Sequence, residues 1–215
     1  MAEIPFVNVY VNNPAYDENL RLQLKELILQ NYNHPCILFW GLFNEINSGW
    51  LDRPSRMAAE LHAWPSVGPE RPTMGASNQD DDFNGFTDLI AFNKYFGWYG
   101  DNMDDMGRWI DREHAAHPER KMGISEYGAG ACVFQQEDSL RHPEPWGQWH
   151  PENWQTYYHV ENWNSFRNAN SCGATSSGAC STFRRQAVGR DPLWDATIRA
   201  GDLRPENKER CLLLL

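Results

Sequence analysis

Two kinds of hydrophobic pattern follow each other along most of the chain. An unbroken apolar run, typical of a strand buried on both faces, predicts a strand at 36–43, and further short, largely apolar segments predict strands at 4–11, 72–77, 89–96 and 121–125. Apolar residues at helical spacing predict helices at 14–31, 55–64 and 103–117. Strands that alternate with helices form β-α-β units, so the pattern predicts a parallel sheet.

A doubly wound sheet and a barrel are both consistent with such units. No glycine-rich phosphate loop follows a predicted strand, which argues against a nucleotide-binding sheet. The fold class expected is therefore α/β, a (β/α)8 TIM barrel that is incomplete, with about strands 3 to 7 in residues 1–170.

Two of the predicted strands are followed by a glutamate. Glu45 comes after the run 36–43 and Asn44, and Glu126 comes directly after the run 121–125. The C-terminal strand ends of a barrel form its active-site face, and two carboxylates about 5–5.5 Å apart perform retaining glycoside hydrolysis. For either glutamate alone, a surface or ion-paired residue is the simpler explanation. Two that each end an apolar strand favour a catalytic pair.

Composition narrows the choice of partners. The net charge of −10 argues against nucleic acid or an anionic membrane, and no apolar run approaches the ~20 residues of a membrane span. The N-terminus has no signal-peptide pattern, which leaves the compartment unknown, with the cytoplasm as default. Ten Trp, eight Tyr and ten Phe suit packing and, in part, carbohydrate binding.

The five cysteines have no metal-ligand spacing and form no paired framework. Neither a metal nor a cofactor is expected. Cys36 and Cys132 are expected to be small buried residues.

Three segments resemble glycoside hydrolase family 2, which includes β-galactosidases, β-glucuronidases and β-mannosidases. His34-Pro35, the apolar run with Trp40 and then Asn44-Glu45 resemble its acid/base signature. The segment 125–130 (SEYGAG) resembles its nucleophile signature, and 91–100 (AFNKYFGWYG) resembles its sixth-strand segment. The resemblance runs from residue 2 to about residue 170.

The resemblance implies a role for each residue of the first two signatures. Glu45 would be the general acid that protonates the leaving oxygen, and then the base that activates water. Glu126 would be the nucleophile that forms a covalent glycosyl-enzyme, and Asn44 would bind the 2-hydroxyl of the substrate.

Further residues would complete the sugar site. Tyr95, or else Tyr99, would donate a hydrogen bond to Glu126 and hold it as a carboxylate. Asn93, Trp98 and Trp149 are candidates for the sugar pocket, and packing is an equal alternative for both tryptophans.

The stretches 141–152 and 157–159 resemble the β-galactosidase branch more than the β-glucuronidase branch, although a loop ordered by ring stacking also explains them. The expected partner is therefore a β-linked oligosaccharide or glycoside, with a galactoside favoured over a glucuronide. A non-catalytic carbohydrate-binding remnant is a further alternative. The family resemblance also implies that the parent proteins are often homo-oligomers.

Residues 171–215 differ in character, with Ser, Gly, Ala, Cys and Arg and no periodicity. The tail can be encoded by codons which, when read in a shifted frame, give other peptides. These peptides resemble the family's eighth strand and closing segment. The hypothesis is therefore an aberrant, frame-shifted tail, with a natural divergent tail as the alternative. The resemblance places residue 4 at about the third barrel strand, so the isolated chain is expected to fold poorly and to be inactive.

Overall fold

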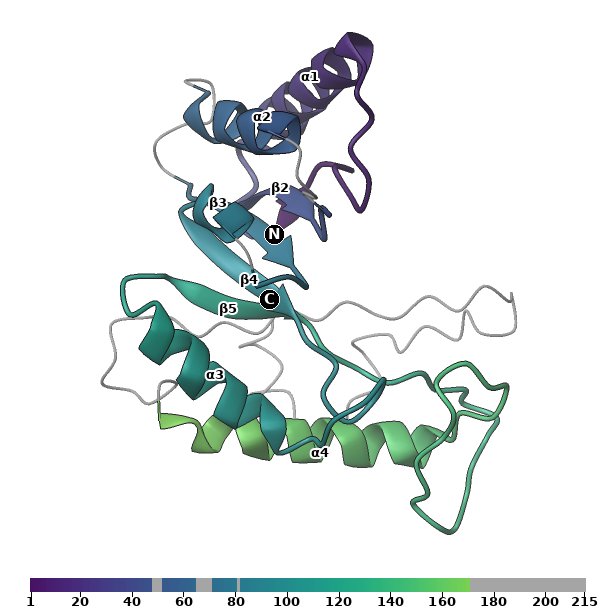
Figure 1. Ribbon diagram of the computed structural model, residues 1–215. Coiled ribbons are helices and arrows are strands. Elements are labelled where there is room, and N and C mark those ends of the chain that lie inside the picture. The colour runs from purple at the N-terminus through teal and green to yellow at the C-terminus, as the bar shows by residue number, and fades with distance from the viewer. Residues whose placement is uncertain (48–51, 65–70, 81, 171–215) are drawn as a thin grey trace. The chain divides into compact units, whose positions relative to one another are not determined.

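The computed structural model describes residues 1–47, 52–64, 71–80 and 82–170 (Figure 1). The chain divides into two compact units. The first is Met1–Asn93 with Lys121–Gly123, and the second is Lys94–Arg120 with the chain from Ile124 onward. The hypothesis of a frame-shifted tail concerns 171–215, which lie outside the described residues.

Five strands form one sheet whose spatial order follows the sequence. They are β1 (Ala2–Glu3), β2 (Trp40–Asn44), β3 (Thr73–Ser77), β4 (Leu89–Asn93) and β5 (Met122–Glu126). The pairs from β1 to β4 are parallel, and every residue of β2, β3 and β5 is buried, as expected of strands in a parallel sheet. A doubly wound sheet reverses its order at a switch point. An order without reversal is that of a barrel wall, as predicted.

The first unit carries two helices, α1 (Pro14–Asn31) and α2 (Asp52–Ala63). The bounds of α1 agree with the prediction because its start is well specified. The side chain of Asn13 accepts a hydrogen bond from the Ala15 backbone N–H at 2.9 Å, and a proline occupies the first helical position. Its apolar stripe packs inward through residues spaced by four: Leu20, Leu24 and Ile28.

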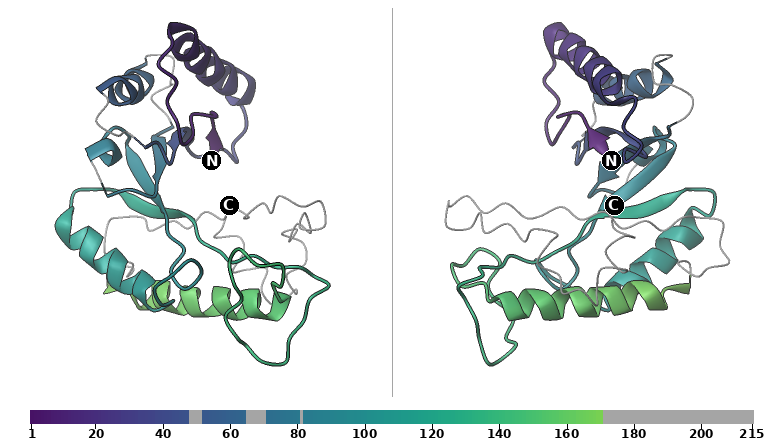
Figure 2. Two further views of the ribbon diagram at one scale, coloured as in Figure 1. Left: turned by 45° about the vertical axis from the view of Figure 1, so that its right-hand side comes forward. Right: turned by 180° about the vertical axis from the view of Figure 1, so that it is seen from behind.

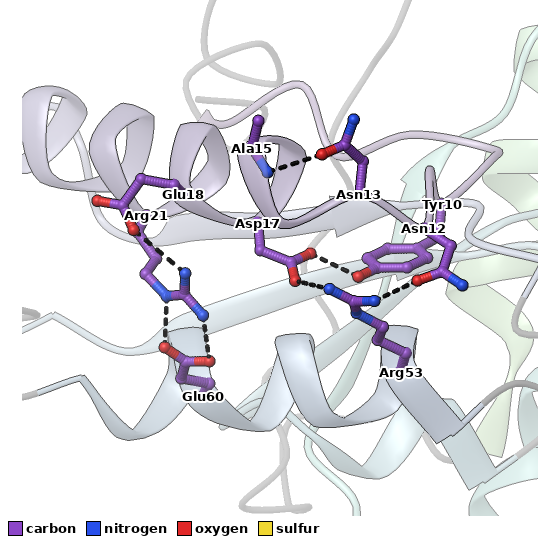
Figure 3. A network of polar contacts seen from close by, with 9 residues as sticks. All are labelled: Tyr10, Asn12, Asn13, Ala15, Asp17, Glu18, Arg21, Arg53 and Glu60. Atoms are coloured by element: carbon purple, nitrogen blue, oxygen red, sulfur yellow. Dashed lines mark hydrogen bonds and ion pairs between the residues drawn. The ribbon is translucent and has the colours of Figure 1, made fainter.

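Polar contacts join α1 to α2 (Figure 3). The Arg21 guanidinium forms two bonds to Glu60, Nε to Oε1 at 2.5 Å and Nη2 to Oε2 at 2.9 Å. Asp17 accepts bonds from Tyr10 Oη at 2.5 Å and from Arg53 Nη2 at 2.8 Å. Burial alone would raise the pKa of Asp17, but these two bonds outweigh it and lower the pKa below its usual value. Burial, with the Asp17 contact, raises the pKa of Tyr10 to about 12.

The second unit carries α3 (Asp105–Ala116) and α4 (Glu152–Asn168), which lie side by side (Figure 2). Gly107 allows the close approach: its N–H donates to Ser165 Oγ at 2.9 Å, and a Cβ there would lie 2.6 Å from the Ser165 carbonyl oxygen. The sequence analysis did not predict α4. A helical signal was present, however, because buried residues recur every four positions: Trp154, Tyr158, Asn162 and Phe166.

The strand predicted at 4–11 is wrong for most of its length. Regular strand structure stops at Glu3, the end of β1, and beyond it Val7 forms an isolated bridge with Asn44. Asn8 has φ +59°, in the left-handed region, and Phe6 N–H bonds the Ile4 carbonyl at 2.8 Å. This local bond and the left-handed residue turn the chain away from extended geometry, and hydrophobicity alone does not reveal either.

The strand predicted at 36–43 begins only at Trp40. The residues before it form a turn, in which Ile37 N–H bonds the His34 carbonyl at 3.1 Å, and Leu38 is half-exposed. The run is therefore apolar in composition but buried only in its second half.

The expectation that both cysteines are buried is wrong. Cys36 is exposed because it lies in the turn before β2, and Cys132 is half-buried on the loop that follows β5. The remaining predicted strands and helices are present, and their ends differ from the prediction by at most three residues. None of the helices that the structure describes is long and apolar enough to cross a membrane.

Candidate active site

Three predicted site residues lie together in the first unit. Asn44 ends β2, Glu45 follows it, and Asn93 ends β4. The Asn93 side-chain amide donates to Asn44 Oδ1 at 3.0 Å and to Glu45 Oε1 at 2.8 Å. One amide therefore fixes both the predicted acid/base and the residue expected to bind the 2-hydroxyl.

The backbone at Glu45 is strained. Its φ is +51°, in the left-handed region, which costs a residue with a side chain about 1–2 kcal/mol. Its N–H bonds the Ala76 carbonyl on β3 at 2.8 Å, and this bond helps hold the conformation. Such strain concentrates at functional sites, where it aims a side chain that regular strand geometry would turn elsewhere.

The second unit holds Glu126, the last residue of β5, which is only 8% exposed. Tyr95 Oη donates to Glu126 Oε2 at 2.6 Å. Of the two tyrosines that the resemblance offered for this bond, the structure places Tyr95 on the carboxylate. The Tyr99 ring packs edge-on against Tyr95, with 5.4 Å between centroids, so Tyr99 supports the donor.

Helix α4 holds the loop that follows Glu126. Gln155 Nε2 donates to the Ala129 carbonyl at 2.5 Å, and the Tyr127 ring packs edge-on against His159 and Phe166 at 5.3 and 5.2 Å. The sequence analysis missed these supporting residues because it did not predict α4. A helical periodicity test over 152–168 would have placed them on the buried side.

The two tryptophans proposed for the sugar pocket have different surroundings. Trp98 is 3% exposed and packs against the edge of His150 at 5.1 Å, which favours its packing role. Trp149 is half-exposed, and its Nε1 donates to Glu137 Oε2 at 3.1 Å.

Trp149 borders a hollow of about 580 Å³ that Glu137 and Arg141 also line. Hydrogen bonds from Ser139, Arg141 and Trp149 lower the pKa of Glu137 to about 2. This carboxylate therefore stays ionised and ties the loop together. Among residues 1–47, 52–64, 71–80 and 82–170, no group of three or more His, Cys, Asp or Glu side chains is placed to hold a metal ion.

These features define a class of protein. A parallel sheet in sequence order, with buried strands whose C-terminal ends carry polar residues, is part of the wall of a (β/α)8 barrel. The family model of glycosyl hydrolases family 2, TIM barrel domain, matches residues 2–165, and the chain belongs to this family.

Known relatives agree with that assignment. A β-glucuronidase from Bacteroides fragilis is 51% identical over 170 residues, which are 75% of this chain and 24% of the relative. A crystal structure from Bacteroides fragilis, provisionally named a β-galactosidase, has a TM-score of 0.69 and 33% identity over 78% of this chain and 25% of its own. A Bacteroides uniformis β-glucuronidase structure has a TM-score of 0.70 and 25% identity over 85% of this chain and 23% of its own. The chain thus spans about a quarter of the length of these relatives.

Proposed function

We propose that this chain supplies the catalytic carboxylates of a retaining β-glycosidase, with a β-glucuronide as its substrate. The observation that carries the proposal is the pair of hydrogen-bonded glutamates at strand ends. Glu45 accepts a bond from Asn93, and Glu126 accepts one from Tyr95. Both lie inside the segment that matches the family model, and the family consists of glycoside hydrolases.

The proposed reaction has two steps. In the first, Glu126 attacks the anomeric carbon while Glu45 protonates the leaving oxygen, so that a glycosyl–Glu126 ester forms and the glycosidic bond breaks. In the second, Glu45 removes a proton from water, the water oxygen bonds the anomeric carbon, and Glu126 is released. The mechanism requires about 5–5.5 Å between the two carboxyl groups.

Neighbouring side chains would assist each step. The Tyr95 phenol stabilises Glu126 as a carboxylate, ready to attack. The Asn93 amide orients Glu45, and Asn44 binds the 2-hydroxyl of the sugar, a contact that strengthens in the transition state.

The glucuronide replaces the galactoside that the sequence analysis favoured. The support is the 51% identity with a protein named β-glucuronidase. A galactoside is the second candidate, since the relative with the provisional β-galactosidase name is 33% identical.

The test grafts residues 2–165 in place of the corresponding segment of the Bacteroides fragilis β-glucuronidase, which supplies the rest of that protein. The grafted enzyme is expected to hydrolyse 4-nitrophenyl β-glucuronide. A 2-deoxy-2-fluoro glucuronide should label Glu126 covalently, as read by peptide mass spectrometry. The Glu126→Gln variant should lose the label and on the order of 10³-fold or more in kcat.

A second graft addresses the substrate, because the host also shapes specificity. The same segment is placed in the provisional β-galactosidase, and the ratio of kcat/KM for glucuronide and galactoside is compared with that of the host. A ratio that moves towards the glucuronide supports the proposal, and an unchanged galactoside preference supports the second candidate. If neither graft is labelled while both fold, the chain is better explained as a non-catalytic carbohydrate-binding remnant.

A further inference from the structure

Trp146 is much more exposed to solvent than tryptophan usually is. It is 86% exposed, and its ring stacks on that of Tyr99, with 5.3 Å between centroids and 28° between planes. Tyr99 is itself 51% exposed. Tryptophan is highly buried on average, so an exposed stacked pair suggests a binding surface.

The pair connects to the proposed nucleophile through direct contacts within the second unit. Tyr99 packs edge-on against Tyr95 at 5.4 Å, and Tyr95 donates its hydrogen bond to Glu126. Trp146 is thus two ring contacts away from the tyrosine that bonds the carboxylate. A molecule that reaches Glu126 has a row of aromatic rings beside it.

The loop that carries Trp146 is held by hydrogen bonds. Gly147 N–H donates to the Glu144 carbonyl at 2.8 Å, and His150 Nε2 also lies 2.9 Å from this oxygen. Gln135 Nε2 donates to the Gln148 carbonyl at 2.9 Å. Because these bonds fix the loop on both sides of Trp146, little ordering is needed when a ligand binds.

The surroundings of this loop are polar as well as aromatic. The hollow of about 580 Å³ includes Gly147, next to Trp146, together with Glu137, Arg141, Gln148 and Trp149. Aromatic faces among charged and amide groups suit a sugar, whose ring has C–H faces and a rim of hydroxyl groups.

We propose that Trp146 and Tyr99 form a platform that binds a second sugar ring of the substrate, next to the ring whose bond is cleaved. The platform rests on the proposed function, since it takes Glu126 as the reacting group. It makes the substrate an oligosaccharide rather than a glycoside with a small leaving group.

The test uses the Glu126→Gln variant of the grafted β-glucuronidase, which should not hydrolyse its ligands, and measures binding by isothermal titration calorimetry. The ligands are a β-linked disaccharide that ends in glucuronic acid, methyl β-glucuronide and 4-nitrophenyl β-glucuronide. Trp146→Ala is expected to weaken disaccharide binding on the order of 10-fold, as loss of a ring contact does, and to leave the methyl glycoside unchanged. Trp146→Phe keeps a ring and should recover most of the affinity.

Phe134→Ala is the matched control, since Phe134 is 87% exposed on the same loop and should leave all three affinities unchanged. The platform is refuted if Trp146→Ala and Phe134→Ala behave alike, or if the folded graft with Trp146 in place binds the disaccharide no more tightly than methyl β-glucuronide. A loss confined to the nitrophenyl ligand would mean an aromatic leaving group, which also contradicts the proposal. If Trp146→Ala leaves binding unchanged but alters the mass of the graft in light scattering, Trp146 belongs to an interface between copies, and the platform is refuted. Labelling of Glu126 in the grafted enzyme tests the proposed function separately.

Discussion

The bond from Tyr95 to Glu126 gives the sharpest prediction. Tyr95→Phe removes one hydroxyl, while the ring that packs against Tyr99 at 5.4 Å is retained. Glu126 is 8% exposed, so water replaces the lost donor poorly. A hydrogen bond to a charged group contributes about 1.5–3 kcal/mol. If the bond acts on the reaction in full, kcat/KM should fall about 10- to 150-fold.

The assay is hydrolysis of 4-nitrophenyl β-glucuronide by the grafted enzyme, with thermal unfolding measured in parallel. Tyr32→Phe is the control, because it removes a hydroxyl from a half-exposed ring that the proposed site does not use. It should change kcat/KM less than about 2-fold, within the range expected of surface substitutions. The reasoning fails if Tyr95→Phe is equally mild, or if its loss of activity is matched by a loss of folded protein.

Three further outcomes follow from individual residues. Glu45→Gln should lower kcat/KM for 4-methylphenyl β-glucuronide about 10²- to 10⁴-fold. It should lower kcat/KM much less for the 2,4-dinitrophenyl glycoside, because that leaving group needs no proton. Equal losses for the two substrates would contradict the acid role. Asp17→Asn should destabilise the chain to urea at pH 7. Because the folded-state pKa of Asp17 is lowered, this difference should be fully present well above pH ~4 and should shrink as the pH falls; a difference that grows in acid would refute it. Gly107→Ala should cost about 1–3 kcal/mol of stability through contact with the Ser165 carbonyl, whereas Gly100→Ala, with open space around the added methyl group, should be nearly neutral.

The parts of the fold that could be predicted are those in which local pattern and burial agree. The bounds of α1 follow from the cap at Asn13 and one buried stripe, and both are visible in the sequence. The strand at 4–11 failed because a left-handed Asn8 interrupts an apolar run, and hydrophobicity does not encode backbone conformation. Helix α4 was missed because its inward side consists of aromatic and amide side chains, which a search for aliphatic residues does not count.

The residues of the site also differ in how far the sequence predicts them. Glu45 and Glu126 stand at strand ends, a position that periodicity can locate. Their partners could not be derived from spacing, because a hydrogen bond between distant residues depends on how neighbouring strands align. The resemblance supplied Tyr95 and Asn93 as candidates, and the structure shows which oxygen each contacts. The strain at Glu45 had no sequence signal, since only Gly and, less often, Asn or Asp visit this region routinely.

The segment 93–95, at the C-terminal end of β4, contacts both proposed catalytic residues. Asn93 ends the strand and bonds Glu45, and Tyr95, two positions later, bonds Glu126. A segment without a carboxylate thus supplies a neutral donor to each proposed catalytic group, the amide for the acid/base and the phenol for the nucleophile. This division of contacts separates their effects. A change at Asn93 should act on proton transfer to the leaving group and, through Asn44, on the 2-hydroxyl contact, whereas a change at Tyr95 should act on attack at the anomeric carbon. The C-terminal end of β4 is therefore as much a part of the proposed machinery as the strand ends that carry the glutamates.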